Sequence, residues 1–206
     1  MNFSKVIHLS LICLIGLFIT TSISAQPNDA EKKIKLFNAT LLTVMQNAKD
    51  LKFSGRYNTL QPIIGDCFDM DFMAQFSAGK YWRNLSNIQR TKLIEAFEKL
   101  WVSIYADRFD GYSGEIFELQ ESKNAPRGTV LVKTNIIMND GEKLPIDYLM
   151  RQINGSWLVI DIFLKGRFSE LAKQRAEYSS VLRREGFDGL MTKVEKKVQL
   201  LTNSAP

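Results

Sequence analysis

Apolar side chains recur every three or four positions through the first half of the chain, which is the spacing of amphipathic helices. Asp69 is placed to cap one of these helices, and Gly79 to end it. Ser86 and Gln89 form a capping-box pattern at the start of another. The predicted helices cover residues 28–50, a short stretch around Leu60 that follows a break at Gly55, residues 69–79 and residues 87–109.

From residue 115 the pattern changes to the alternation of half-buried strands. Turn residues occur at Asp140-Gly141 and at Asn154-Gly155, and the helical spacing returns after Gly166 with a break at Gly186. The predicted strands cover residues 115–120, 129–138, 143–153 and 156–164, with a turn at 124–128. This order predicts an α+β fold. A four-stranded antiparallel meander and the N-terminal and C-terminal helices would form a cone, similar to that of nuclear transport factors, with an internal apolar cavity.

Two-residue turns at both of these positions would set the register of the sheet. Gln152 would face Trp157, and a row of Lys133, Tyr148 and Asp161 would cross one sheet face. The apolar neighbours of that row are Ile146, Met150, Val159 and Phe163, and the opposite face would carry Val130, Val132, Ile136, Leu149, Leu158, Ile160 and Ile162. Both faces are largely apolar, so the face without the packed helices has to meet further helices, a partner or a ligand.

The N-terminus has the pattern of a secretory signal peptide. One positive charge at Lys5 precedes an apolar run over residues 6–20, and small residues lead to a cleavage position after Ala25. A retained membrane anchor is the alternative, but the run is short for a span of about 20 residues. We expect a signal peptide over residues 1–25 and a single exported domain over residues 26–206.

Composition excludes several kinds of chemistry. The chain has 206 residues and one histidine, His8, which lies in the predicted signal peptide, so the exported domain has no histidine for a triad or a metal site. Its single cysteine, Cys67, forms no internal disulfide and is expected to fill the core. The net charge of +5 is spread along the chain, which argues against nucleic acid. Phosphate-binding and dinucleotide-binding glycine motifs are absent, so we expect neither cofactor nor metal.

Asp161 stands out because it lies within the apolar sequence WLVIDIFL. Burying a carboxylate is costly unless it is paired. An enzyme would use Asp161 as a general base with a raised pKa, and Tyr148 as an acid. The alternative is a structural carboxylate held by hydrogen bonds or by a basic side chain.

An ordered set of residues along nearly the whole exported chain resembles the MlaC family, the periplasmic phospholipid-binding proteins of the toluene-tolerance group. In the first half these are Phe68-Asp69, Met73-Ala74, Gly79, Trp82, Ser86, Gln89-Arg90, Phe97, Leu100 and Tyr105-Ala106, and in the second half Tyr148, Trp157, Asp161, Gly166, Ser169, Arg175 and Gly186. Residues 106–115 and 161–178 are most similar to the HpnM subgroup, which is associated with hopanoid biosynthesis. Arg167-Phe168 departs from the family, in which a small apolar residue is usual after Gly166.

The resemblance implies a non-enzymatic periplasmic carrier that shuttles phospholipid or hopanoid between the inner and outer membranes. Its partners would be an inner-membrane transporter complex and an outer-membrane lipid-transfer protein, and the carrier itself would be a monomer. Basic pairs at Arg183-Arg184 and Lys196-Lys197 favour acidic headgroups or acidic docking surfaces, or simply form a solvated helix face. Two alternatives remain: an enzyme that uses Asp161 and Tyr148, and an adaptor that binds a transporter through the exposed sheet face.

Aromatic residues near helical spacing at the end of the helix over 87–109 mark either plain core or the mouth of the cavity. The loop over residues 109–114 contains two glycines and two aromatic residues, which suits a gate as well as a simple turn. The residues expected to line the lipid cavity are Trp101, Tyr105 and Tyr112 from the helix and loop, with Val132, Ile136, Ile146, Tyr148, Met150, Val159 and Phe163 from the sheet.

Overall fold

The computed structural model describes residues 27–204, and the predicted signal peptide lies outside this range. The helices are α1 (Pro27–Gln46), α2 (Ala48–Cys67), α3 (Met70–Ala78), α4 (Asn87–Arg108) and α5 (Glu170–Ser204), with short 3-10 turns at Gly79–Asn84 and Pro126–Gly128. The strands are β1 (Ile116–Ala125), β2 (Thr129–Ile137), β3 (Lys143–Ile153), β4 (Ser156–Leu164) and β5 (Phe168–Ser169). The α+β fold is thus confirmed, with five strands in place of the predicted four.

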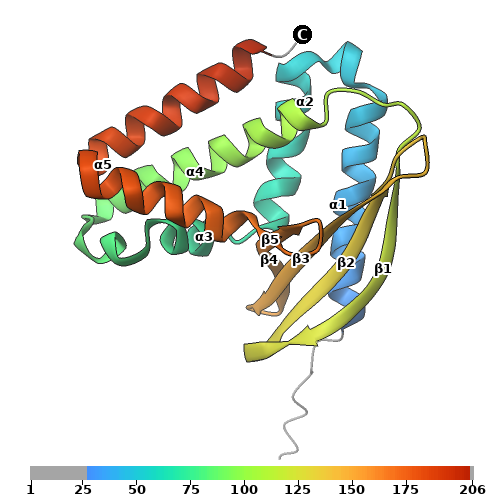
Figure 1. Cartoon of the computed structure of the whole chain (residues 1–206), viewed down its shortest axis with the longest axis horizontal. Coiled ribbons are helices and arrows are strands. Elements are labelled where there is room, and N and C mark those ends of the chain that lie inside the picture. Colours follow the sequence, from blue (N-terminus) through green and yellow to red (C-terminus); the bar gives the residue numbers. More distant parts are fainter. Residues whose placement is uncertain (1–26, 205–206) are drawn as a thin grey trace, which may run out of the picture.

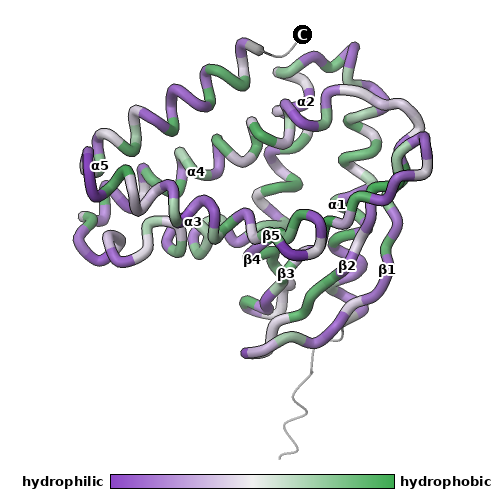
Figure 2. Tube along the Cα trace, in the orientation of Figure 1, coloured by the Kyte–Doolittle hydropathy of each residue, from purple (hydrophilic) through white to green (hydrophobic). Residues whose placement is uncertain are grey.

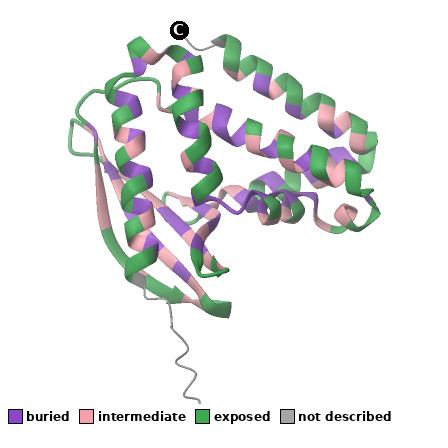
Figure 3. Cartoon of the chain, turned by 180° about the vertical axis from the view of Figure 1, so that it is seen from behind, coloured by how far each residue is buried: buried purple, intermediate pink, exposed green. Residues whose placement is uncertain are grey.

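The sheet is an antiparallel meander in the order β1-β2-β3-β4-β5. Helix α1 lies along one face, which we call the inner face, while α3, α4 and α5 form a helical unit beside the sheet (Figure 1). Hydrophobic positions alternate with hydrophilic ones along the strands and helices (Figure 2), and buried positions recur along the same elements when the molecule is seen from behind (Figure 3). One apolar core therefore connects the helical unit to the inner face of the sheet.

Local signals fix the helix ends where the sequence predicts them. The Asp69 carboxylate accepts a hydrogen bond from the Phe72 backbone N–H at 3.0 Å and caps α3. Ser86 and Gln89 form the predicted capping box of α4. Gly186, with φ of 69°, divides α5 into two segments. These ends depend on side chains a few residues apart, so sequence alone determines them.

Two predictions about the first helices are wrong. The helix expected over residues 28–50 ends at Gln46, where the Asn47 side chain donates to the Thr43 carbonyl at 2.8 Å and competes with the helical ladder. Gly55 does not break the chain but lies inside α2, and the irregular residue is Lys52, with φ of 52°. A Cβ at Gly55 would stand 3.0 Å from the Leu51 side chain, so the glycine there serves close packing.

The register between β3 and β4 agrees with the prediction only near the turn that joins the two strands. Gln152 faces Trp157 across the two-residue turn, as predicted. A bulge then interrupts the ladder, because Met150 pairs with Val159 whereas Leu149 pairs with Asp161. The residue opposite Tyr148 is therefore Ile162, where the sequence predicted Asp161.

The β2–β3 register differs as well. The Met138 backbone N–H donates to the Glu142 carbonyl at 2.8 Å, which leaves a three-residue loop that ends at Gly141, with φ of 85°. Lys133 consequently faces Asp147, and Val132 faces Tyr148. The predicted row of Lys133, Tyr148 and Asp161 does not exist. The strand predicted over 115–120 is also too short, since β1 continues to Ala125 past an irregularity between Leu119 and Ser122.

Candidate functional site

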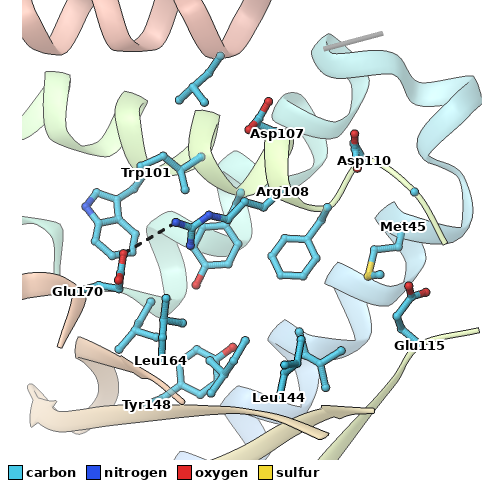
Figure 4. Close-up of a pocket in the computed structure, with 18 of the residues that line it drawn as sticks. Met45, Trp101, Asp107, Arg108, Asp110, Glu115, Leu144, Tyr148, Leu164 and Glu170 are labelled. Atoms are coloured by element: carbon cyan, nitrogen blue, oxygen red, sulfur yellow. Dashed lines mark ion pairs between the residues drawn. The ribbon is translucent and has the colours of Figure 1, made fainter. Parts of the chain in front are cut away.

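A cavity of about 700 Å³ lies between the inner face of the sheet and helices α4 and α5 (Figure 4). Its volume falls within the range of about 300–1,000 Å³ that is typical of small-molecule sites. The apolar side chains that line it are Met45, Trp101, Ile104, Tyr105, Phe109, Ile136, Met138, Leu144, Ile146, Tyr148, Ile162, Leu164 and Leu201.

Aromatic rings from α4 and from Phe109, the residue that follows this helix, form one wall of the cavity. The Tyr105 and Phe109 rings stack with a centroid distance of 5.6 Å and an interplanar angle of 16°. The Trp101 ring lies 6.4 Å from that of Tyr105. Because residues three or four apart share a helix face, this wall follows directly from the periodicity of α4.

The tyrosine hydroxyls in the cavity remain protonated at neutral pH. Burial raises the pKa of both Tyr105 and Tyr148 well above the usual range. The Tyr148 hydroxyl lies 3.3 Å from Asn38 Oδ1, to which it donates a hydrogen bond, and the side chain is 1% exposed. These groups act as neutral parts of an apolar wall.

Charged side chains surround the apolar part of the cavity. Arg108 and Glu170 approach each other at 3.9 Å. Glu115 is buried, and its carboxylate accepts a hydrogen bond from the Ser113 backbone N–H at 2.6 Å. The other charged residues on the lining are Asp107, Asp110, Lys173, Glu177 and Lys197. The cavity thus combines an apolar interior with an ionic edge.

The structure places five of the ten predicted lining residues on the cavity wall: Trp101, Tyr105, Ile136, Ile146 and Tyr148. Val132, Met150 and Val159 are buried in the core and do not line the cavity. Tyr112 is exposed in the loop before β1, and Phe163 lies on the outer face of the sheet. The sequence did not predict the lining residues that come from α5, because the pattern of that helix does not indicate which element it packs against.

Asp161 and Tyr148 do not form a pair. Tyr148 lines the cavity, whereas Asp161 borders a hollow on the other side of the sheet. The Asp161 carboxylate accepts hydrogen bonds from the backbone N–H groups of Ile162 and Leu171, at 2.7 and 3.1 Å, and from the Ser169 hydroxyl at 2.6 Å. Burial raises its pKa. The carboxylate therefore anchors the start of α5.

The outer face of the sheet has a hollow of its own, of about 730 Å³. Leu131, Leu149 and Phe163 line it from the strands, and Phe72 and Phe76 from α3. Lys133, Asp147 and Asp161 also lie on this face, so the outer face is mixed and not largely apolar as the sequence predicted. The predicted faces are wrong as well, because Val132 and Ile136 share the inner face with Tyr148 whereas Phe163 does not.

Three further observations concern metal binding, membrane-spanning helices and the single cysteine of the described chain. Within residues 27–204, no group of three or more His, Cys, Asp or Glu side chains is placed to hold a metal ion. No helix in the same range has the length and hydrophobicity needed to cross a membrane. Cys67 is a free, buried cysteine, and burial raises the pKa of its thiol to about 12.

Comparison with known proteins finds similarity to a family model, to a sequence relative and to solved structures. The family model described as MlaC protein matches residues 35–196. The toluene tolerance protein ttg2D of Pseudomonas putida is 22% identical over an alignment of 212 positions. The alignment covers 97% of this chain and 96% of the relative. A phospholipid-binding protein of Ralstonia solanacearum, solved in complex with a phospholipid, superimposes with a TM-score of 0.74 at 20% identity, over 84% of this chain and 98% of that one.

Proposed function

Because the chain belongs to the MlaC family, we propose that it binds phospholipid and holds the acyl chains in the cavity between α4, α5 and the sheet. The observation that carries the proposal is the apolar cavity of about 700 Å³ with its ionic edge. Burial of a CH₂ group contributes about 0.8 kcal/mol, so a sixteen-carbon chain offers roughly 12 kcal/mol before the costs of binding. The charged edge would keep the headgroup close to solvent.

The related proteins support the same assignment. The Ralstonia solanacearum protein with this fold was solved with a bound phospholipid. The Pseudomonas putida relative carries the name of a toluene tolerance protein and matches along almost its whole length. We extend these properties to this chain because the fold and the cavity agree with them.

The proposed pathway is transport across the periplasm. After cleavage of the signal peptide, residues 26–206 would act as a monomer that receives lipid from one membrane and delivers it to the other. An inner-membrane transporter complex and an outer-membrane lipid-transfer protein would be its partners. No step in this pathway needs a catalytic residue or a cofactor, and Asp161 and Tyr148 are already engaged in separate structural contacts.

Hopanoid is the second candidate ligand. The likeness to the HpnM subgroup over residues 106–115 and 161–178 points to it, and so does the stacked wall of Tyr105 and Phe109. A flat aromatic surface suits a rigid fused-ring lipid as well as an acyl chain. An adaptor that uses the apolar hollow on the outer face would instead bind a transporter and carry no lipid.

The deciding experiment is native mass spectrometry of the protein purified from periplasm without detergent, followed by solvent extraction and lipid identification. A bound phospholipid supports the carrier proposal, and a bound hopanoid supports the subgroup assignment. A protein that is free of lipid and captures none from phospholipid vesicles contradicts both, and leaves the adaptor and the enzyme as the alternatives to test.

A further inference from the structure

The hollow on the outer face of the sheet, which we call the outer hollow, is as large as the lipid cavity but separate from it. Its volume is about 730 Å³, against about 700 Å³ for the cavity, and the two share no lining residue. Both volumes are typical of sites that bind small molecules. The apolar side chains that line the outer hollow include Phe72, Phe76, Leu131, Leu149, Phe163 and Leu171.

The chemistry of the outer hollow changes along β3. Arg151, Leu149 and Asp147 occupy alternate positions of this strand, so their side chains lie on one sheet face, and all three line the hollow. Leu131 faces Leu149 across the ladder between β2 and β3 and widens the apolar part. From residue 147 to residue 151 a strand rises about 13 Å. An apolar stretch therefore separates a basic end from an acidic end.

Two arginines lie at the basic end. Arg127 belongs to the turn before β2, and Arg151 lies near the end of β3. Because Val130 pairs with Met150, both arginines are at the same end of the ladder, and both line the hollow. Arg127 is exposed and forms no ion pair with another described residue. Its positive charge is thus available to a ligand.

Arg151 joins this basic end to an aromatic wall. Its Cζ atom lies 4.2 Å from the centroid of the Phe72 ring, which lines the hollow from α3. Its Nε and Nη2 atoms both donate to Asp69 Oδ2, which fixes the side chain, although 37% of that side chain remains exposed. The Phe76 ring follows at 5.9 Å from that of Phe72. The wall therefore continues from the guanidinium into the hollow.

The two acidic residues of the lining are already engaged. Asp147 faces Lys133 across the ladder between β2 and β3, at the end of the hollow away from Arg151. Asp161 accepts three hydrogen bonds that anchor the start of α5. The charge of the outer hollow that is free to meet a ligand is consequently that of Arg127.

We propose that the outer hollow binds an amphiphile that has one acyl chain and an anionic head group. The chain would lie against Leu131, Leu149 and the rings of α3, and the carboxylate or phosphate would meet Arg127 and the exposed part of Arg151. Because the basic end is open to solvent, this ligand would exchange with the solution and is detected by titration, not by co-purification. The site is distinct from the cavity of the proposed function and does not depend on it.

The test is a titration of the exported chain with decanoate, decyl phosphate and decanol, which share one chain and differ in the head group. Methyl NMR signals of Leu131 and Leu149 report on the outer hollow, and those of Ile136 and Ile146 report on the cavity. We expect both anions to shift the outer signals, with affinities about fivefold above that of decanol, or about 1 kcal/mol. The anion that binds more tightly identifies the head group, and added salt should weaken both.

Matched variants separate the charge from the apolar wall. Arg127→Gln should remove the preference for decanoate over decanol. The control Arg183→Gln changes the net charge equally at an exposed position outside the hollow, and should keep the preference. Leu149→Trp fills the hollow and should abolish the Leu131 methyl shifts for all three probes. Ile146→Trp narrows the cavity on the other face and should keep them, at equal unfolding temperatures of the two tryptophan variants.

The results that would overturn the proposal are distinct from a failure of the proposed function. Shifts confined to the cavity signals would show that the outer hollow binds no amphiphile. Equal affinities of decanoate and decanol at the hollow, unchanged by Arg127→Gln, would rule out the anionic head group. No shift of the outer signals up to the solubility limit of the probes would favour a partner protein on this face. A cavity that takes up no lipid contradicts the proposed function alone.

Discussion

The Ser169 hydroxyl donates a hydrogen bond to Asp161 Oδ2 at 2.6 Å across the turn that leads from β4 into α5. Ser169 Oγ in turn accepts a hydrogen bond from the Ala172 backbone N–H at 2.8 Å, and Asp161 Oδ1 accepts one from that of Leu171. Together they satisfy two backbone donors in the first turn of α5. That turn also carries Glu170 at the cavity edge, so this pair positions one wall of the site.

Asp161→Asn should therefore weaken folding without abolishing lipid binding. Because the amide keeps one acceptor oxygen but loses the charge, we expect a loss of about 1–2 kcal/mol in the free energy of unfolding. Urea denaturation measures this loss, and lipid extraction measures binding. Asp188→Asn is the control at an exposed position. Unchanged stability combined with a complete loss of function would instead point to a chemical role for Asp161.

A larger side chain on β3 that points into the cavity should exclude the ligand. Ile146 and Leu149 lie on the same strand but face the cavity and the outer hollow, respectively. Overpacking costs about 1–3 kcal/mol, so both Ile146→Trp and Leu149→Trp should be somewhat destabilised. We expect only Ile146→Trp to lose most of the lipid that co-purifies with the protein, as measured per mole of folded protein. The reverse result would move the binding site to the outer face.

The order of elements and their caps could be predicted from the sequence because each depends on neighbouring residues. The sheet register could not, for two local reasons. The bulge near Ile160 occurs in an apolar run without glycine, so no residue type in this run predicts it. The bulge moved Asp161 away from Tyr148. The turn at Gly141 is compatible with loops of two or three residues, and this one-residue difference moved Lys133 away from Tyr148.

The cavity itself was only half predictable for a different reason. The helical periodicity of α4 indicates which face is apolar, and so identified Trp101 and Tyr105. The corresponding pattern in α5 does not say which element that helix covers, so Gln174 and Leu201 gave no sign of lining the cavity. Tertiary contacts between elements far apart in sequence decide such positions.

The Cys67 thiol should be inert in the folded protein. Its side chain is fully buried, and its pKa of about 12 leaves almost no thiolate at pH 8. In the exported chain, a disulfide reagent such as DTNB should react with less than about a tenth of the thiol within minutes, and fully after addition of denaturant. Rapid reaction without denaturant would mean that the α2–α3 region opens under native conditions.

Arg56 should be essential for the contact between α2 and α4. Its buried guanidinium donates from Nε to the Ala106 carbonyl at 2.8 Å and from Nη1 to the Ala48 carbonyl at 3.0 Å. Arg56→Met leaves both carbonyls without these donors, which should lower the free energy of unfolding by about 2–4 kcal/mol. The exposed Arg183→Met is the matched control, and similar losses in the two variants, measured in urea, would contradict this role.

Asp147 should make the stability depend on pH in a defined direction. The side chain is 6% exposed on the outer face, and burial raises the pKa of its carboxyl, with Lys133 and the Thr134 backbone opposing the shift in part. The folded state thus binds this proton more tightly than the unfolded chain. The tighter binding of this proton stabilises the folded state fully below the unfolded pKa of about 3.9, and this stabilisation is lost as the pH rises through the folded pKa.

Asp147→Asn removes the ionisation, so the variant should gain stability relative to the wild type between pH 4 and pH 7. Urea midpoints at both values measure the gain, with the exposed Asp71→Asn as control, and a gain that shrinks toward pH 7 would show that the charged carboxylate is stabilised in the fold.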